Sequence, residues 1–154
     1  MKSPSGSTPR AAGFTLIEVL VVLGIFGILM ASGLVLNLDF YRGYVFHAER
    51  NILVSVLAKA RSQSLSNLNQ AKHGVRIEPS KYTIFEGQTW FERNSSLDEV
   101  IEGDSSLKLS AQPAWPLEIV FSQLAATTTN ATISISSGSR SASITINEAG
   151  RINW

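Results

Sequence analysis

The feature that most constrains this chain is a long run of apolar residues near its start. The run begins at Phe14, and no charged residue lies between Val19 and Leu38. About 20 apolar residues in a helix are enough to cross the hydrocarbon core of a bilayer. One carboxylate, Glu18, lies just inside the run, where an ionisable side chain is costly and typically functional. The sequence therefore predicts a membrane-type helix over residues 14–38 with one functional acid.

The residues before the run form a polar leader that ends in glycine. The leader contains Lys2 and Arg10 and has no acid, and such positive charge favours a cytoplasmic N-terminus with the remainder translocated. An ordinary secretory signal is cut after its apolar region, next to small residues. No small-x-small triplet lies beside the end of the run at Leu38, and a cut at Ala31-Ser32-Gly33 would leave a large apolar remnant. We therefore expect the removable segment to be the leader itself, residues 1–13.

Residues 13–23, which read Gly-Phe-Thr-Leu-Ile-Glu-Val-Leu-Val-Val-Leu, resemble the type III signal of type IV pilins and type II secretion pseudopilins. The resemblance implies that a prepilin peptidase cuts between Gly13 and Phe14 and methylates the new N-terminus on Phe14. The amine of Phe14 then lies about one helical turn from Glu18, and a buried carboxylate is tolerable when a cation neutralises it. We expect Glu18 to pair with an N-terminus, preferably that of a neighbouring subunit, and so to set the register of assembly. A plain membrane anchor would need neither Glu18 nor a Gly13-Phe14 junction.

The part of the chain beyond the apolar run is long enough for one small domain, at roughly 115 residues. The chain has no cysteine, so an extracytoplasmic domain must rest on its core rather than on disulfides. The formal net charge is +1, and loss of the leader with Lys2 and Arg10 brings the side-chain total to −1. Such a balance gives no bulk electrostatic case for nucleic-acid binding.

Hydrophobic periodicity predicts a helix followed by β-structure. No proline lies between Pro9 and Pro79, so one continuous helix is expected from Phe14 to Asn67. Apolar residues recur at three- and four-residue spacing from Tyr44 onward, which predicts an amphipathic helix with one buried face. That face would hold Val45, Ala48, Ile52, Val56, Leu57, Ala60 and Leu68.

After Gln70 the apolar period changes to two, which predicts strands. A first hairpin pairs Val75 and Ile77 with Tyr82 and Ile84, and Trp90-Phe91 would extend its sheet. Residues 93–106 are interpreted mainly as loop. Further strands are predicted at 107–109 and 117–121, in a second hairpin that carries Ile133, Ile135, Ile144 and Ile146, and in a short final strand that ends at Trp154.

The outer half of the chain carries a second resemblance. Residues 54–64, Val-Ser-Val-Leu-Ala-Lys-Ala-Arg-Ser-Gln-Ser, are similar to the helix of the H-type pseudopilin and FimT-like minor pilin group. The strands at 75–85 and 119–121 and the closing Gly150-Arg151-Ile152 follow the order of that group. The resemblance implies an α+β fold, in which a long N-terminal helix, half membrane and half amphipathic, packs on two antiparallel β-sheets. It divides the chain into a leader (1–13), a transmembrane or filament-core helix (14–38) and a pilin-like extracytoplasmic domain (39–154).

The implied function is that of a minor pilin or pseudopilin, a structural subunit of a type IV pilus or type II secretion pseudopilus. Such a subunit is expected to have no enzymatic activity and no cofactor. Its expected partners are a prepilin peptidase, other pilin or pseudopilin subunits, the inner-membrane assembly platform, and membrane lipid before assembly. The expected location is a single pass through the cytoplasmic membrane, N-terminus in the cytoplasm and C-terminal domain in the periplasm, and then the filament.

The main alternative is a DNA-binding minor pilin of a competence system, acting as an anchored binding module. Some FimT-like relatives bind DNA through a C-terminal Gly-Arg-x-Arg tail. Here the tail reads Gly150-Arg151-Ile152-Asn153, so the second arginine is missing, and Arg140 in the predicted hairpin is the candidate second contact. Two arginines give only a weak, salt-sensitive contact with phosphates.

We expect the other candidate residues to have structural rather than functional roles. His47 and His73 are expected to be solvated or packed. Metal sites built on cysteine are excluded, since the chain has none, and no other metal site is expected. The acids Glu99, Glu102 and Asp104 are expected in a solvated loop. Trp90, Trp115 and Trp154 are expected to pack in the core or at its edge rather than to form a carbohydrate- or partner-binding face.

Overall fold

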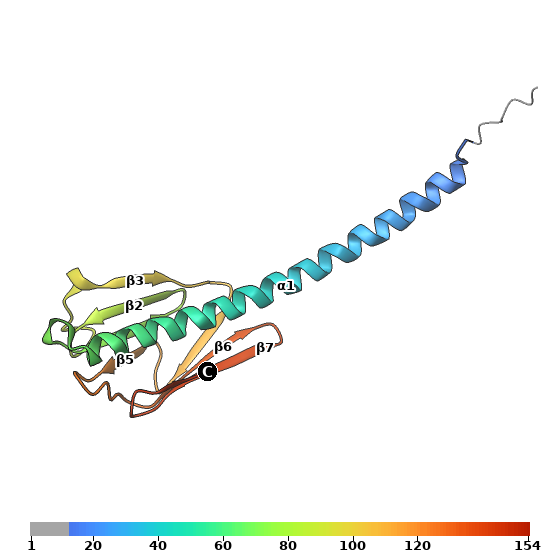
Figure 1. Cartoon of the computed structure of the whole chain (residues 1–154). Coiled ribbons are helices and arrows are strands. Elements are labelled where there is room, and N and C mark those ends of the chain that lie inside the picture. Colours follow the sequence, from blue (N-terminus) through green and yellow to red (C-terminus); the bar gives the residue numbers. More distant parts are fainter. Residues whose placement is uncertain (1–12) are drawn as a thin grey trace, which may run out of the picture. The chain divides into compact units, whose positions relative to one another are not determined.

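The computed structural model of the chain describes residues 13–154, without the side chains of residues 33–39. Residues 1–12 of the expected leader lie outside the described residues. Contacts divide the chain into two compact units, with the boundary between Phe40 and Tyr41. Helix α1 (Leu16–Leu65) belongs to both units (Figure 1). The prediction of one continuous helix is thus confirmed to within two residues at each end.

The described residues of the second unit contain two antiparallel sheets of four strands each. The first has the order β3-β2-β1-β5 and the second β4-β6-β7-β8, so the α+β prediction is confirmed. Two short 3-10 helices, η1 (Leu68–Gln70) and η2 (Ser95–Leu97), lie between elements. The strands are β1 (His73–Glu78), β2 (Lys81–Glu86), β3 (Glu99–Glu102), β4 (Lys108–Gln112), β5 (Leu117–Phe121), β6 (Ala131–Ser137), β7 (Arg140–Ile146) and β8 (Ile152–Asn153).

Both predicted hairpins form in the expected register. In β1 and β2, Val75 pairs with Ile84, and in β6 and β7, Ile133 pairs with Ile144. These apolar pairs all contribute to one core cluster that also contains the second half of α1. Alternate positions of β6 and β7 carry small polar residues that are half-buried or exposed, as expected for strands with one solvated face.

The buried face of the amphipathic helix differs from the predicted one. Val56, Leu57 and Ala60 are buried as expected, whereas three other predicted positions are only half-buried (Val45, Ala48 and Ile52) and Leu68 is exposed. The remaining buried positions are Phe46, Glu49, Leu53 and Ser64. The predicted face leaves out Glu49 because a charged residue is not expected at a buried position.

Two predictions for the segment between β2 and β4 are wrong. Residues 99–102 form strand β3 at the edge of the first sheet rather than a loop, and Lys81 pairs there with Glu102. Trp90 does not extend the sheet. The centre of its ring lies 3.5 Å from the guanidinium carbon of Arg93 and 4.7 Å from that of Arg76, and the ring meets that of Phe85 edge to face. The loop after β2 thus covers the face of the sheet that points away from the core cluster.

Candidate functional site

The predicted cleavage junction precedes helix α1. Gly13 and Phe14 are both exposed and non-helical, and Phe14 is 83% exposed. A Cβ added at Gly13 would meet no atom within 4 Å. The junction is therefore accessible to a peptidase, and a side chain at Gly13 would not disturb the described fold.

Glu18 has a local role that the sequence interpretation missed. The Oγ1 of Thr15 accepts a hydrogen bond from the backbone N–H of Glu18 at 3.3 Å, which caps the start of α1. Thr15 and Glu18 stand in the Thr-x-x-Glu spacing of a capping box, in which a carboxylate in the first turn also favours the helix dipole. The spacing is visible in the sequence and could have revealed this role. The Glu18 side chain is exposed, so capping leaves its carboxylate available.

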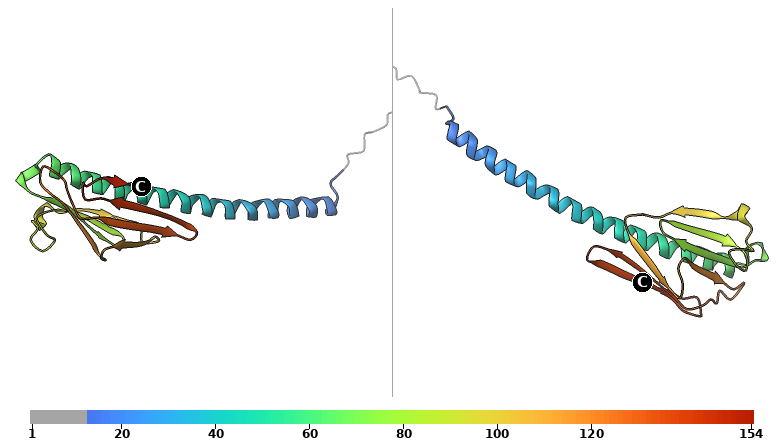
Figure 2. Two further views of the ribbon diagram at one scale, coloured as in Figure 1. Left: turned by 90° about the horizontal axis from the view of Figure 1, so that it is seen from below. Right: turned by 180° about the vertical axis from the view of Figure 1, so that it is seen from behind.

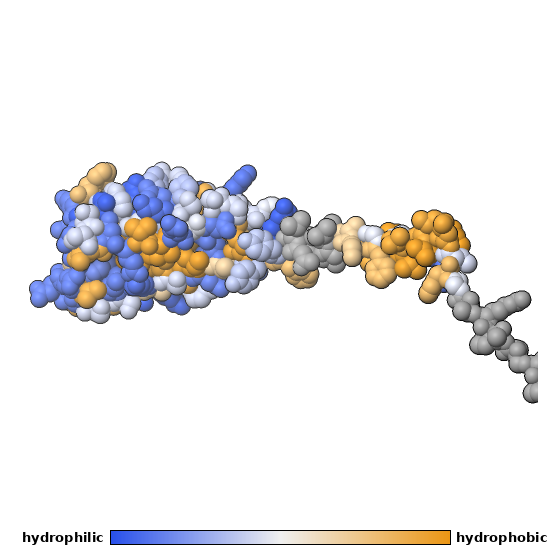
Figure 3. Space-filling model, turned by 90° about the horizontal axis from the view of Figure 1, so that it is seen from above, coloured by the Kyte–Doolittle hydropathy of each residue, from blue (hydrophilic) through white to orange (hydrophobic). Residues whose placement is uncertain are grey.

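The first turns of α1 expose a nearly continuous hydrophobic surface. Figure 3 shows this surface on the described residues that precede position 33. A shallow groove of about 270 Å³ is lined by Phe14, Glu18, Val19, Val22 and Leu23, so the carboxylate borders the same groove as the first residue of the expected mature chain. Such an unpartnered apolar surface is typical of a segment that contacts lipid or another helix.

Within the described residues, no helix is both long enough and apolar enough to span a membrane.

The predicted tail residue Arg151 lies in a groove beside helix α1. This groove, of about 390 Å³, is lined by Ala58, Arg61, Gly150, Arg151, Ile152, Asn153 and Trp154. Figure 2 shows the C-terminal strand next to the helix. The Nε of Arg61 is buried and has no hydrogen-bond partner among the described residues. Sequence reasoning did not associate Arg61 with the tail, because the two are 90 positions apart in the chain.

Arg140 does not lie near Arg151. Arg140 begins β7, and Ile146 at the other end of that strand pairs with Ile152. The guanidinium of Arg140 lies instead against α1, 3.6 Å from where a Cβ of Gly43 would be. The two predicted contacts therefore belong to different ends of the second sheet.

The two histidines lie in different environments, and Trp115 and Trp154 are exposed, at 38% and 63%, rather than packed in the core. His47 is exposed, whereas His73 is buried, with its Nε2 3.7 Å from an oxygen of Glu86. Burial lowers the pKa of His73, although Glu86 and a backbone hydrogen bond to Ala71 oppose this. Among the described residues, no group of three metal-ligating side chains comes together.

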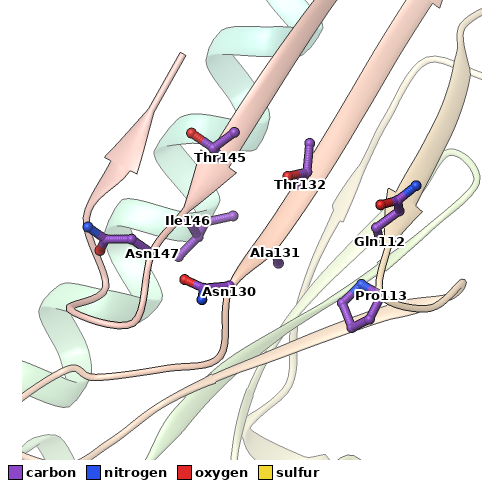
Figure 4. Close-up of a pocket in the computed structure, with 8 residues that line it drawn as sticks. All are labelled: Gln112, Pro113, Asn130, Ala131, Thr132, Thr145, Ile146 and Asn147. Carbon is purple, nitrogen blue, oxygen red and sulfur yellow. The ribbon is translucent and has the colours of Figure 1, made fainter.

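A third groove, of about 480 Å³, lies on the second sheet (Figure 4). Its lining carries no charged or nucleophilic group beyond threonine and amide side chains: Gln112, Pro113, Asn130, Ala131, Thr132, Thr145, Ile146 and Asn147.

Glu49 is the buried acid that joins the helix to the first sheet. Its carboxylate accepts hydrogen bonds from the hydroxyl of Tyr82 on β2 and, at 3.1 Å, from the backbone N–H of Asp104. Tyr82 is fully buried. Burial raises the pKa of Tyr82, and the hydrogen bond to Glu49 raises it further. This contact orders the acidic segment after β3 against the helix.

Tyr82 should make the domain sensitive to alkaline pH. Because its pKa is raised on folding, the stabilisation is complete below the unfolded value of about 10 and is lost as pH rises above it, by up to ~1.4 kcal/mol per pH unit. Urea unfolding of residues 41–154 between pH 8 and 11 measures this loss. Tyr82→Phe should flatten the alkaline slope and cost about 1–3 kcal/mol at neutral pH, since Glu49 loses a donor.

Tyr44→Phe is the matched control, because Tyr44 is exposed. This variant should change neither the alkaline slope nor the free energy of unfolding at neutral pH. If the free energy of unfolding of Tyr82→Phe still falls as steeply at alkaline pH, a group other than Tyr82 causes the loss.

Comparison with known proteins gives two matches. A family model described as the prokaryotic N-terminal methylation motif matches residues 8–34. The structure of the minor pseudopilin EpsH from the type 2 secretion system of Vibrio cholerae matches with a TM-score of 0.54 and 15% sequence identity, covering 70% of this chain and 94% of that chain. No curated protein sequence matches significantly.

The motif match covers the exposed junction, Glu18 and the start of the apolar helix. The structural match covers most of the chain and concerns the fold. Residues 8–34 therefore match the prokaryotic N-terminal methylation motif, and the fold of the chain is similar to that of the minor pseudopilin EpsH.

Proposed function

We propose that this chain is a minor pilin or pseudopilin, a structural subunit without enzymatic activity that joins a type IV pilus or a type II secretion pseudopilus. The observation that carries the proposal is the methylation motif at residues 8–34, at the start of a helix whose described first turns are apolar and exposed. The pseudopilin-like fold supports the same conclusion.

In this proposal the chain waits in the cytoplasmic membrane as a precursor. The uncharged stretch from Val19 to Leu38 supports a stage in lipid, with the leader in the cytoplasm and residues 39–154 outside. Prepilin peptidase cuts between Gly13 and Phe14 and methylates Phe14. With the help of the assembly platform, the apolar helix then moves from lipid into the core of the filament.

Glu18 is proposed to set the register between subunits. Its carboxylate is exposed beside the groove that Phe14 also lines. Moving a lone carboxylate into an apolar filament core is costly unless a cation neutralises it. The amine of a neighbouring subunit's Phe14 meets this requirement, and its position along the helix then fixes the stagger of the two chains.

The processing step is tested by Gly13→Val. Because a Cβ at this position meets nothing within 4 Å, the variant should fold normally, yet its branched side chain should crowd the scissile bond and block cleavage. Mass spectrometry of the wild-type protein, isolated from cells with an active prepilin peptidase, should find N-methyl-phenylalanine at the start. The variant should keep its leader.

Gly24→Val is the matched control, since a Cβ at Gly24 also meets nothing within 4 Å and that residue lies well inside the helix. It should be cut normally. An intact leader on the wild-type protein, or a mature N-terminus beyond residue 30, would contradict the proposal.

A DNA-binding minor pilin remains the second candidate, because of the groove beside Arg151. Arg61 and Arg151 line the same groove as Trp154, and neither arginine makes an ion pair with another described residue. About two phosphate contacts predict a shallow log–log salt slope, near −2. We therefore expect double-stranded DNA to bind weakly and to dissociate at physiological salt, as measured by fluorescence titration at two salt concentrations.

Two variants test whether the tail is responsible for any binding. Asn153→Arg restores the second arginine of the DNA-binding relatives and should strengthen binding if the tail contacts DNA. Arg140→Gln is the matched control, because Arg140 lies at the other end of β7. Sub-micromolar affinity at about 150 mM salt, abolished by Arg151→Ala, would instead favour the DNA-uptake function.

A further inference from the structure

The third groove lies across the ends of three neighbouring strands of the second sheet. Its lining includes the last residue of β4, the first residues of β6 and the last residues of β7 (Figure 4). In the strand register, Gln112 stands opposite Thr132, and Thr132 stands opposite Thr145. Residues directly opposite each other point to the same face of a sheet, and here Gln112 and Thr145 are exposed. These three side chains therefore form one polar row across the solvent face.

The backbone beneath this polar row is already paired. β6 is bonded to β4 on one side and to β7 on the other, and β7 is bonded to β6 and β8. A strand in the middle of a sheet has used its N–H and C=O groups, whereas recognition by strand addition needs a free edge. A ligand in the groove therefore meets side chains, and an extended peptide cannot add there as a further strand.

No charged side chain lines the groove. Glu148, which follows the lining residue Asn147, is not part of the lining, and its Oε1 accepts a hydrogen bond from Nδ2 of Asn130 at 3.2 Å. An ion that enters such a groove loses water without gaining an opposite charge, which is costly. The groove therefore suits a neutral ligand better than a phosphate, a carboxylate or a metal ion.

The groove offers hydrogen-bond donors and acceptors together. The Oδ1 of Asn147 accepts a bond from the backbone N–H of Arg151 at 2.8 Å, which orients the amide and leaves its NH₂ group to donate. Asn130 has the opposite arrangement, because its NH₂ group is bonded to Glu148 and its carbonyl oxygen is left to accept. Three further lining side chains make no hydrogen bond to any described residue: Gln112, Thr132 and Thr145. Since a hydroxyl both donates and accepts, this mixture fits a ligand with several hydroxyls.

The rest of the lining is apolar. Pro113, Ala131 and Ile146 belong to it, and a sugar ring likewise combines hydroxyls at its rim with C–H groups on its faces. The volume of about 480 Å³ falls within the usual range of small-molecule sites. No aromatic ring lines the groove, so stacking adds nothing, and the dissociation constant should be about 1 mM.

We propose that the third groove binds a neutral oligosaccharide. The polar row of Gln112, Thr132 and Thr145 bonds to ligand hydroxyls, and the amides of Asn130 and Asn147 bond to hydroxyls at one end of the row. This inference goes beyond the proposed function, because neither processing nor assembly through the apolar helix involves this face of the sheet. It gives the outer domain a means of holding glycan outside the cytoplasmic membrane.

The test uses the full chain in an amine-oxide detergent, which has no sugar headgroup. Chitotetraose and maltotetraose are the probes, and saturation-transfer NMR measures their binding. We expect transfer to the ring C–H protons of at least one probe, with a dissociation constant of about 1 mM. Thr132→Val with Thr145→Val removes two hydroxyls, keeps the side-chain shape and suits a strand. This pair should weaken binding about tenfold, the sum of two modest hydrogen bonds.

Ser134→Ala with Ser143→Ala is the matched control. These serines stand opposite each other on the same two strands, two residues further along each strand, and both are exposed outside the groove. Removing their hydroxyls should leave binding unchanged. Circular dichroism checks that both double variants are folded.

Three results would overturn the inference. The first is no transfer to either tetrasaccharide at ~10 mM, and the second is equal binding by the Thr132→Val, Thr145→Val chain. The third is equally tight binding of tetragalacturonic acid or of a serine tetrapeptide, which would remove the preference for a neutral saccharide. None of these results bears on the proposed function, which is measured by N-methylation of Phe14 and by incorporation into filaments.

Discussion

Residues 41–154 carrying Leu57→Asp are expected to be unfolded, whereas the same residues with the natural Leu57 should form a soluble, monomeric and cooperatively folding domain. Leu57 is fully buried in the core cluster that joins α1 to both sheets. Its loss alone costs about 2–5 kcal/mol, and an unpaired buried carboxylate adds several more. A small domain has roughly 5–15 kcal/mol of stability in total. Gel filtration and thermal melts followed by circular dichroism measure the outcome.

Ser55→Asp places the same charge two residues earlier on the exposed face of the helix. It should shift the melting temperature little, because most surface substitutions change stability by no more than about 0.5 kcal/mol. A soluble, cooperatively melting Leu57→Asp domain would show that this helix face is not the one that holds the two sheets together.

Glu18→Gln is expected to abolish incorporation into filaments while leaving cleavage and membrane insertion intact. Glutamine serves as well as glutamate at the third helical position of a capping box, so the cap made by Thr15 should survive. The variant loses only the charge that we propose neutralises a neighbour's amine. Incorporation is measured by shearing filaments from the cells and comparing the amount of this chain in the filament fraction with its amount in the membrane fraction.

Comparison with Glu18→Leu separates charge from capping. Both variants should fail to assemble if charge pairing sets the register, and Glu18→Leu should insert at least as well as the natural chain, because a carboxylate in a membrane helix costs up to ~3 kcal/mol near its centre and less near its end. If Glu18→Gln assembles at the natural level and Glu18→Leu does not, the helix cap rather than the charge is the important property.

The elements whose apolar residues recur at a regular spacing were predictable from the sequence. The helix and both hairpins have the predicted positions because their apolar residues recur at the period of the structure they form. Strand β3 was not predictable, since it holds only Val100 and Ile101 between two acids and forms by pairing with β2 at an edge. Local composition does not reveal that kind of pairing.

Contacts between side chains far apart in the chain were harder to predict than the helix and the strands. The burial of Glu49 depends on Tyr82 and on the backbone of Asp104, neither of which the helix sequence indicates. Trp90 was expected at a strand, but Arg76 and Arg93 hold it against Phe85. At the candidate site, the junction and Glu18 were recognisable from a contiguous motif. The neighbourhood of Arg151 was not, because Arg61 joins it only through the fold.

Each sheet has one short edge strand, which bears on how such subunits avoid aggregation when crowded. Edge strands expose unpaired backbone groups that can recruit a second sheet. Here β8 has only two residues, and β3 has four, with Glu99 and Glu102 at its ends. Neighbouring copies that meet along β3 or β8 find little backbone to pair with. Growth of β-structure between domains is thereby disfavoured at one edge of each sheet, whereas the opposite edges, β5 and β4, have five residues each.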